Sequence, residues 1–72
     1  MKDERLLKLG SVIRYERIKN NLSQEQLEEI SGVSRRTISE IERGNVDIRY
    51  TNLYQLAKAF KMKVWEFLKY ED

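Results

Sequence analysis

Apolar residues in the first part of the chain recur at intervals of three and four, which is the spacing of one face of an α-helix. Strand-like alternation is absent, and the sequence contains no Pro. A first helix is predicted from about Arg5 to Lys19, with Gly10 in its middle. Because Gly costs about 1 kcal/mol relative to Ala in a helix, we expect close packing against another helix there. The predicted inward residues are Leu6, Leu9, Ile13 and Ile18, and the outward ones are Lys8, Arg14, Glu16 and Lys19.

Two shorter helices are predicted between residues 23 and 44. Ser23 and Gln26 have the spacing of a capping box, in which each side chain bonds the backbone of the other residue. Gly32 can adopt a positive φ and end this second helix. Ser34 then caps the third helix, which ends at Gly44. The predicted inward side chains of these two helices are Leu27, Ile30, Ile38 and Ile41, with Thr37 alongside.

The remaining residues predict a loop and two more helices. The loop runs from Asn45 to Tyr50, and Thr51 is expected to cap the fourth helix. A fifth helix is predicted from about Lys63 to Tyr70. Inward residues are Leu53, Leu56, Ala57 and Phe60, then Val64, Phe67 and Leu68. The pattern therefore predicts an all-α fold: a compact bundle of five short helices in one domain, residues 1–72, whose second and third helices form a helix-turn-helix at about residues 23–44.

The amino-acid composition excludes several kinds of catalytic and metal-binding site. The 72 residues include no Cys and no His, which excludes thiol catalysis, His-based proton transfer and the usual zinc sites. We therefore expect neither an enzyme nor a cofactor. The 14 Lys and Arg against 12 Asp and Glu give a net charge of only +2, which is weak evidence for nucleic acid. Since no apolar run could span a bilayer or serve as a signal peptide, we expect a cytoplasmic protein with no membrane partner.

The outward face of the third helix carries the most informative residues. Arg35, Arg36, Ser39, Glu40 and Arg43 share one side of the helix, opposite the apolar residues. Two Arg in a first turn oppose the helix dipole, at about 0.3–1 kcal/mol each. Charges placed against the helix dipole without a visible structural benefit are typical of a functional site. The planar guanidinium can bond guanine O6 and N7 or a phosphate, so double-stranded DNA is the expected partner.

A structural explanation of this face is the alternative. In it, the residues form a solvated surface, and Arg35 pairs with Glu28 or Glu29 of the preceding helix. Glu40 could likewise accept a bond from cytosine N4 or orient a neighbouring Arg, whereas in the alternative it is a negative charge that weakens phosphate binding.

The segment from Ser23 to Gly44 resembles the helix-turn-helix of the phage Cro/repressor-type regulators, often called the XRE family, whose fold is lambda-repressor-like. The matching residues are Ser23-Gln24-xx-Leu27, Gly32-Val33-Ser34 and Thr37-Ile38-Ser39-xx-Glu42-Arg43-Gly44, with Gly10-xx-Ile13-Arg14-xx-Arg17 upstream and Leu53-xx-Leu56-Ala57-xx-Phe60 downstream. The resemblance covers nearly the whole chain, from about Leu9 to Leu68.

The resemblance implies a role for each matching site residue. Gln24 would bond a phosphate and brace the reading helix, while Arg17 and Glu42 would form a structural ion pair. Arg43 and Asn45 would lie near the DNA backbone. The residues expected to face the major groove are Ser34, Arg35, Arg36, Ser39 and Glu40, with Arg35 and Arg36 as the main base readers.

The sequence departs from the family pattern at three places. Glu28 stands where the family usually has Ala, Asp47 adds a charge that repels phosphate, and Lys61 replaces a frequent Gly after the fourth helix. The last change suggests a different bend at that point.

Aromatic residues near the C-terminus suggest a second surface. Trp65, Tyr54 and Tyr70, with Tyr50 as a further candidate, could form an exposed patch used as a dimer interface. The alternative is partial burial of Trp65 against the fourth helix. A symmetric dimer would present two reading helices about 34 Å apart.

The sequence as a whole predicts a sequence-specific DNA-binding transcriptional regulator, a homodimeric repressor that reads a palindromic operator through the major groove. One alternative is an antitoxin or a restriction–modification controller with the same fold. The other is a protein-interaction module that binds a small protein partner through the Trp65 and Tyr70 surface and does not bind DNA.

Overall fold

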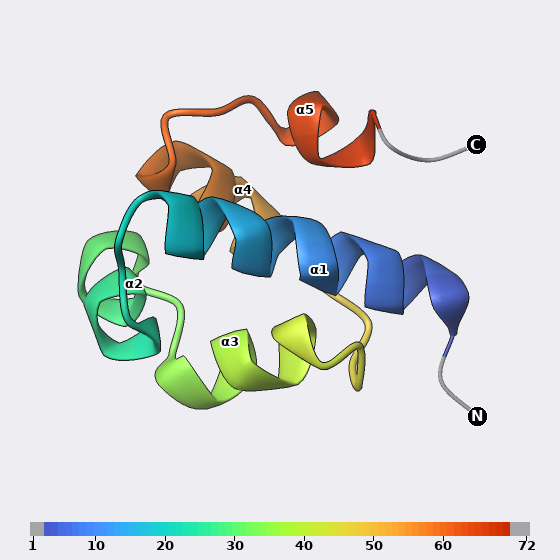
Figure 1. Cartoon of the computed structure of the whole chain (residues 1–72). Helices are drawn as coiled ribbons and strands as arrows, with labels where there is room; N and C mark the ends of the chain where they lie inside the picture. Colours follow the sequence, from blue (N-terminus) through green and yellow to red (C-terminus); the bar gives the residue numbers. More distant parts are fainter. Residues whose placement is uncertain (1–2, 70–72) are drawn as a thin grey trace.

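The computed structural model describes residues 3–69, which form helices and loops without any strand in that range. The helices are α1 (Glu4–Lys19), α2 (Gln24–Ser31), α3 (Arg35–Glu42), α4 (Tyr50–Ala59) and α5 (Val64–Leu68). In Figure 1, α1 runs across the middle, with α3 on one side and α4 and α5 on the other. The predicted all-α bundle of five helices is confirmed. None of the described helices has the length and apolar character needed to cross a membrane.

Polar caps set the beginnings of the first three helices. Ser23 and Gln26 form the predicted capping box, with backbone-to-side-chain distances of 2.8 and 3.0 Å. Ser34 accepts a bond from the Thr37 amide and caps α3 as predicted. At α1 the cap is Asp3, whose carboxylate accepts bonds from the backbone and guanidinium of Arg5. The bond from the Arg5 guanidinium, followed by the bond from the Arg5 amide, lowers the pKa of Asp3 to about 2, so the cap stays ionised at more acidic pH than an ordinary Asp.

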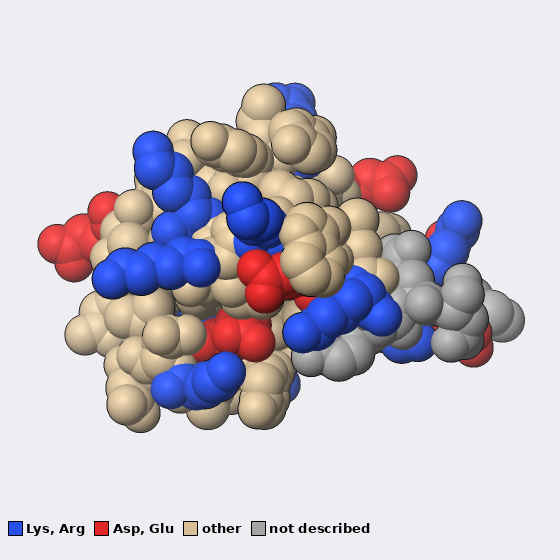
Figure 2. All heavy atoms as spheres, turned by 90° about the horizontal axis from the view of Figure 1, so that it is seen from above, with Lys and Arg blue, Asp and Glu red and all other residues tan. Residues whose placement is uncertain are grey.

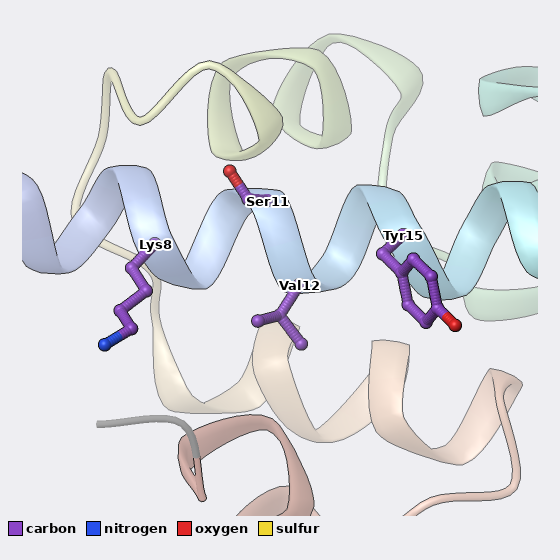
Figure 3. A pocket seen from close by; sticks show the side chains of 4 residues that line it. All are labelled: Lys8, Ser11, Val12 and Tyr15. Atoms are coloured by element: carbon purple, nitrogen blue, oxygen red, sulfur yellow. The ribbon is translucent and has the colours of Figure 1, made fainter. Parts of the chain in front are cut away.

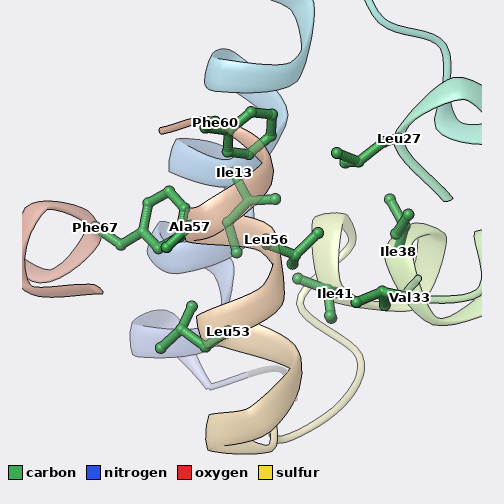
Figure 4. Close-up of a cluster of buried hydrophobic side chains, with 10 residues drawn as sticks. All are labelled: Ile13, Leu27, Val33, Ile38, Ile41, Leu53, Leu56, Ala57, Phe60 and Phe67. Carbon is green, nitrogen blue, oxygen red and sulfur yellow. The ribbon is translucent and has the colours of Figure 1, made fainter. Parts of the chain in front are cut away.

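The hydrophobic core receives side chains from all five helices and from the turn between α2 and α3 (Figure 4). Its buried members are Ile13, Leu27, Val33, Ile38, Ile41, Leu53, Leu56, Ala57, Phe60 and Phe67. Phe60 and Phe67 pack edge to face, with ring centroids 6.1 Å apart. The inward faces predicted for α3 and α4 are confirmed.

The predicted inward face was wrong for two residues of α1 and α2. Ile18 and Ile30 are 54% and 57% exposed. In α2 the buried positions are Leu27 and Ser31, one turn apart, so the helix is rotated relative to the prediction. Ser31 is buried because its hydroxyl accepts the Val33 amide at 3.1 Å, which satisfies a donor in the turn.

The outward face predicted for α1 also needs a correction. Lys8, Arg14 and Lys19 are exposed as expected, but Glu16 is only 9% exposed. Its position lies within a turn of the buried Ile13, on the same side of the helix. The sequence suggested an outward position because Glu is charged, but burial here follows helix geometry.

Two helix boundaries differ from the prediction. The fourth helix begins at Tyr50, so Thr51 lies inside it and Arg49 is the N-cap, without a side-chain capping bond. The fifth helix covers Val64–Leu68 rather than extending to Tyr70, which lies outside the described residues, and Leu68 is 36% exposed. The α5 start is instead fixed by Glu66, whose carboxylate accepts the Lys63 amide at 2.9 Å.

Gly10 lies where α1 crosses α3, as its position in the sequence predicted. A Cβ added at this residue would collide with the carbonyl oxygen of Ile41 and lie 3.1 Å from that of Glu42. The two helix backbones therefore touch at this point, and α3 is held directly on α1.

Candidate nucleic-acid interface

A buried ion pair fixes α3 against α1. Arg17 Nε donates to Glu42 Oε2 at 2.7 Å, and a second guanidinium nitrogen donates to Glu42 Oε1 at 3.0 Å. The side chains are only 14% and 4% exposed. The hydrogen bonds that the Arg17 guanidinium donates to Glu42 raise the pKa of Arg17. The structural pair that the resemblance implied is thus present, and it removes Arg17 from the groups available to a ligand.

Arg17 and Glu42 also bind the segment that begins α2. A third guanidinium nitrogen of Arg17 donates to the carbonyl of Leu22 at 2.8 Å. The side-chain amide of Gln24 donates to Glu42 Oε1 at 3.3 Å. Gln24 therefore contacts the end of α3 while it stays partly exposed at the start of α2. This position is the one that its predicted bracing role requires.

The first turn of α3 presents two unpaired guanidinium groups. Arg35 and Arg36 are exposed. Within residues 3–69 neither of them forms an ion pair or a hydrogen bond through its side chain. The alternative pairing of Arg35 with Glu28 or Glu29 is therefore not formed. Since no acidic residue lies in the first turn of α3, this end of the helix is electrostatically suited to an anion.

Ser34 and Ser39 border these two Arg residues. Ser34 is exposed, and its hydroxyl donates to Thr37 Oγ1 at 2.8 Å while it accepts the Thr37 amide. Ser39 is half-buried beside the exposed face. Both side chains are short, so the α3 backbone can approach another surface closely at these positions.

The other end of α3 brings three predicted site residues together. Glu40 accepts bonds from Arg43 and from the side-chain amide of Asn45, each at 3.0 Å. A hollow of about 340 Å³ lies next to this group, between α3, the following loop and the beginning of α4. Its charged lining residues are Arg36, Glu40, Asp47 and Arg49.

Arg49 is a candidate that the sequence analysis did not identify. It is exposed, precedes α4 and lines the same hollow as Arg36. It adds a positive charge to the hollow that Asp47 also lines, and the sequence predicted that Asp47 would repel phosphate. In the sequence, Arg49 is only one basic residue at the end of a loop. Its position near α3 depends on how that loop folds back, which the sequence does not reveal.

A second surface lies between α4 and α5. Tyr54 and Trp65 are 51% and 61% exposed, and with Tyr50 they line one groove of about 470 Å³. The rings of Tyr50 and Tyr54 have centroids 6.4 Å apart. Lys58, Lys61 and Lys63 also line the groove. Figure 2 views the molecule from the side where α4 and α5 lie, and shows basic and acidic side chains interspersed among uncharged residues.

A third, shallower hollow of about 390 Å³ lies beside α1. It is lined by Lys8, Ser11, Val12 and Tyr15, of which Lys8 and Val12 point away from α3 (Figure 3). Among the described residues that line it, Lys8 is the one charged group, and they include no pair of acid and base side chains. In the part of the chain that the structure describes, no group of His, Cys, Asp or Glu could hold a metal ion.

Comparison with known proteins agrees with this geometry. Residues 13–64 match the model of the helix-turn-helix family HTH_3. The chain belongs to this XRE-type family. It is 40% identical over 60 residues to an uncharacterised HTH-type transcriptional regulator of Methanocaldococcus jannaschii, MJ0272, covering 83% of this chain and 91% of that protein. It is 43% identical over 60 residues to the control protein C.SmaI of Serratia marcescens, covering 83% and 71%.

Solved structures of similar proteins share the whole fold. The chain superposes on the restriction–modification controller protein C.AhdI of Aeromonas hydrophila with a TM-score of 0.87 and 32% identity, over 90% of this chain and 98% of that one. The gene regulator ClgR of Corynebacterium glutamicum gives a TM-score of 0.79 at 28% identity, over 88% and 82%. Together with the family match, these similarities identify the protein as a DNA-binding transcriptional regulator.

Proposed function

We propose that this regulator acts as a homodimeric repressor that reads a palindromic operator by inserting α3 into the major groove. It works in the cytoplasm, by binding rather than by catalysis. The observation that carries the proposal is the pair of exposed guanidinium groups of Arg35 and Arg36, which have no partner among residues 3–69. The Arg17–Glu42 pair holds the helix that presents them.

The proposal assigns different roles to the two ends of α3. Arg35 and Arg36 read base edges, where the guanidinium fork can bond guanine O6 and N7. Ser34 and Ser39 lie against the groove. Gln24 from α2 bonds a phosphate while it braces α3 through Glu42. Arg43 and Asn45, at the other end, contact the DNA backbone, which fixes register without reading sequence.

A homodimer would use the groove between α4 and α5. Exposed Trp65 and Tyr54 are the residue types enriched at the centre of interfaces, and the surrounding Lys residues suit a polar rim. The described residues extend over 30 × 23 × 22 Å. To read both half-sites, the dimer must hold its two α3 helices about one DNA turn apart, about 34 Å. Tyr70, the third predicted interface residue, lies outside the described residues.

Selection of bound duplexes from a random pool tests the function directly. We expect an inverted repeat whose half-sites lie one helical turn apart. Arg35→Ala and Arg36→Ala should each weaken binding to the selected site by about 1–3 kcal/mol and relax the preference at one base pair of each half-site. Lys8→Ala, which removes the same charge from the α1 hollow, is the matched control and should leave the base preference unchanged.

The comparison of these variants distinguishes recognition of base sequence from general electrostatic attraction to DNA. If Lys8→Ala weakens binding as much as Arg35→Ala and Arg36→Ala do, the two Arg contribute only charge and α3 is not the reading element. If the wild-type protein selects no sequence and gives no shift with duplex DNA at low salt, the proposal of operator binding is wrong.

A restriction–modification controller is the second candidate. Its support is the 43% identity to the control protein C.SmaI and the TM-score of 0.87 to the controller C.AhdI. In this case, the selected operator should recur upstream of genes for a restriction endonuclease or its methyltransferase. An operator found only beside unrelated genes would favour a general regulator.

A further inference from the structure

Glu40 is bound on both of its carboxylate oxygens. Oε1 accepts a bond from a guanidinium nitrogen of Arg43, and Oε2 accepts one from the side-chain amide of Asn45, both at 3.0 Å. Its backbone carbonyl also accepts the Asn45 amide at 3.0 Å. Glu40 therefore holds Asn45 through its backbone and through its side chain at the same time.

These bonds fix the segment that follows α3. Arg43 is the C-cap of the helix, and Gly44 has a φ of 72° and donates its amide to the Ile41 carbonyl at 3.0 Å. A Cβ on Gly44 would lie 2.8 Å from the side chain of Leu7, so the turn packs closely on α1. The turn is thus confined on one side by α1 and on the other by the Glu40 carboxylate.

The same bonds limit what Glu40 can do on the exposed face of α3. An unpaired carboxylate facing DNA would repel phosphate, but this one lies in an ion pair with Arg43. Both oxygens already accept a bond, so the carboxylate is oriented toward Arg43 and Asn45 rather than left free to turn toward a base. The geometry therefore favours the orienting role over base reading.

We infer that Glu40 is a positioning residue: it fixes Arg43 and Asn45 at the end of α3 in the arrangement that contacts the DNA backbone, and it does not read a base. The inference rests on the proposed function for its effect on DNA. The bonds themselves can be tested without DNA.

A pair of substitutions separates the bonds from the charge. Glu40→Gln and Glu40→Ala both remove the negative charge, but only Gln keeps an oxygen that can accept the Asn45 side chain. Each variant is measured by fluorescence anisotropy against the selected operator and against operators changed at every base pair in turn. We expect Glu40→Ala to bind about 3- to 10-fold more weakly than Glu40→Gln, by the same factor on every operator.

A third variant tests the coupling between the two residues. Asn45→Ala should weaken binding in the wild-type background, and it should cost less in the Glu40→Ala background, where Asn45 is no longer held in position. Equal binding by Glu40→Gln and Glu40→Ala would overturn the inference, and so would fully additive effects. A changed preference at a single base pair in the Glu40 variants would assign base reading to Glu40 instead.

Hydrogen exchange measured by NMR provides the readout that does not need DNA. If Glu40 holds the turn, the Asn45 backbone amide should exchange faster in Glu40→Ala than in Glu40→Gln, whereas the amides of α4 should not change. Equal protection of Asn45 in both variants would contradict the positioning role even if the wild-type protein binds DNA. Absence of DNA binding by the wild-type protein, with the exchange difference present, would contradict only the proposed function.

Discussion

At the scale of single residues, Glu42 links three segments of the chain. Its carboxylate accepts bonds from Arg17 on α1 and from Gln24 at the start of α2, while the residue itself ends α3. A buried carboxylate is stable only when its partners compensate for lost hydration. The pair therefore sets the position of α3 relative to α1 and α2.

Glu42→Gln should lower the free energy of unfolding by about 3 kcal/mol, because it leaves the Arg17 guanidinium largely buried without its counter-charge. Urea unfolding followed by circular dichroism provides the measurement. Glu28→Gln is the same substitution on an exposed residue of α2, and it should change the free energy by less than about 0.5 kcal/mol. Similar losses in the two variants would mean that the ion pair contributes no net stability.

Lys61 has a backbone conformation that is unfavourable for any residue with a Cβ atom. It has a φ of 58°, in the left-handed region that Gly adopts most readily. The turn after α4 is therefore left-handed although Gly is absent, so Lys61 itself accommodates the bend. Its amide donates to the Lys58 carbonyl at 3.0 Å, which ties the residue to the end of the helix.

Lys61→Gly should raise the free energy of unfolding by about 0.5–1 kcal/mol, because the steric cost of left-handed backbone exceeds the entropy cost of Gly. Lys58→Gly, in the last turn of α4, should have the opposite sign and lower it by about 1 kcal/mol. Thermal unfolding of the two variants beside the wild type measures both effects. A loss of stability in both would show that the left-handed Lys carries no strain.

At the scale of elements, the fold depends on how closely α1 approaches α3. Gly10 permits contact between the two backbones, and Ile13 and the Arg17–Glu42 pair continue the same interface along α1. The sequence predicted the close approach at Gly10 from its unfavourable helix propensity. It did not predict which α3 residues meet Gly10, because the crossing position depends on packing of both helices.

Gly10→Ala should destabilise the protein by at least about 1–3 kcal/mol, although Ala favours a helix more than Gly does. The added Cβ would overlap the Ile41 carbonyl and force α3 outward. Chemical unfolding of Gly10→Ala and Ser11→Ala checks this, since Ser11 is exposed on the next position of the same helix and should tolerate Ala. A more stable Gly10→Ala variant would mean that α3 can move away from α1 without loss.

Element boundaries show where prediction from sequence succeeds. The starts of α2 and α3 were predicted correctly because Ser23 and Ser34 carry local capping bonds. The start of α4 was not, because Arg49 makes no side-chain cap and Thr51, a good capping residue, lies inside the helix. No local capping bond therefore marks the start of α4, and the sequence carries no signal at Arg49 that would have placed it.

At the scale of the whole molecule, the proposed homodimer would form through the groove between α4 and α5. Trp65→Ala should weaken homodimerisation about 10-fold or more, since buried Trp residues often dominate the energy of interfaces. Tyr15→Ala is the matched control, because Tyr15 is 60% exposed and Trp65 is 61% exposed, but it lies on α1 outside this groove. Sedimentation equilibrium of both variants measures the association constant.

Loss of the dimer should also change how the protein binds its operator. The dimerisation-deficient variant should bind an isolated half-site like the wild type and lose affinity mainly for the full inverted repeat. If Tyr15→Ala weakens association and Trp65→Ala does not, the interface lies on α1 and not between α4 and α5.

The sequence by itself determined the features that depend on neighbouring residues: the helical periodicity, the caps at Ser23 and Ser34, the turn at Gly32 and the exposed Arg35 and Arg36 on one face of α3. Only the tertiary structure decided which side of α2 is buried, where Glu16 lies and how Glu40 is used. The first two outcomes depend on how the helices pack against one another, and the third depends on how the chain turns after α3. Glu40 shows the difference clearly, since its position on α3 follows from spacing alone, whereas its bond to Asn45 depends on how the chain turns after the helix.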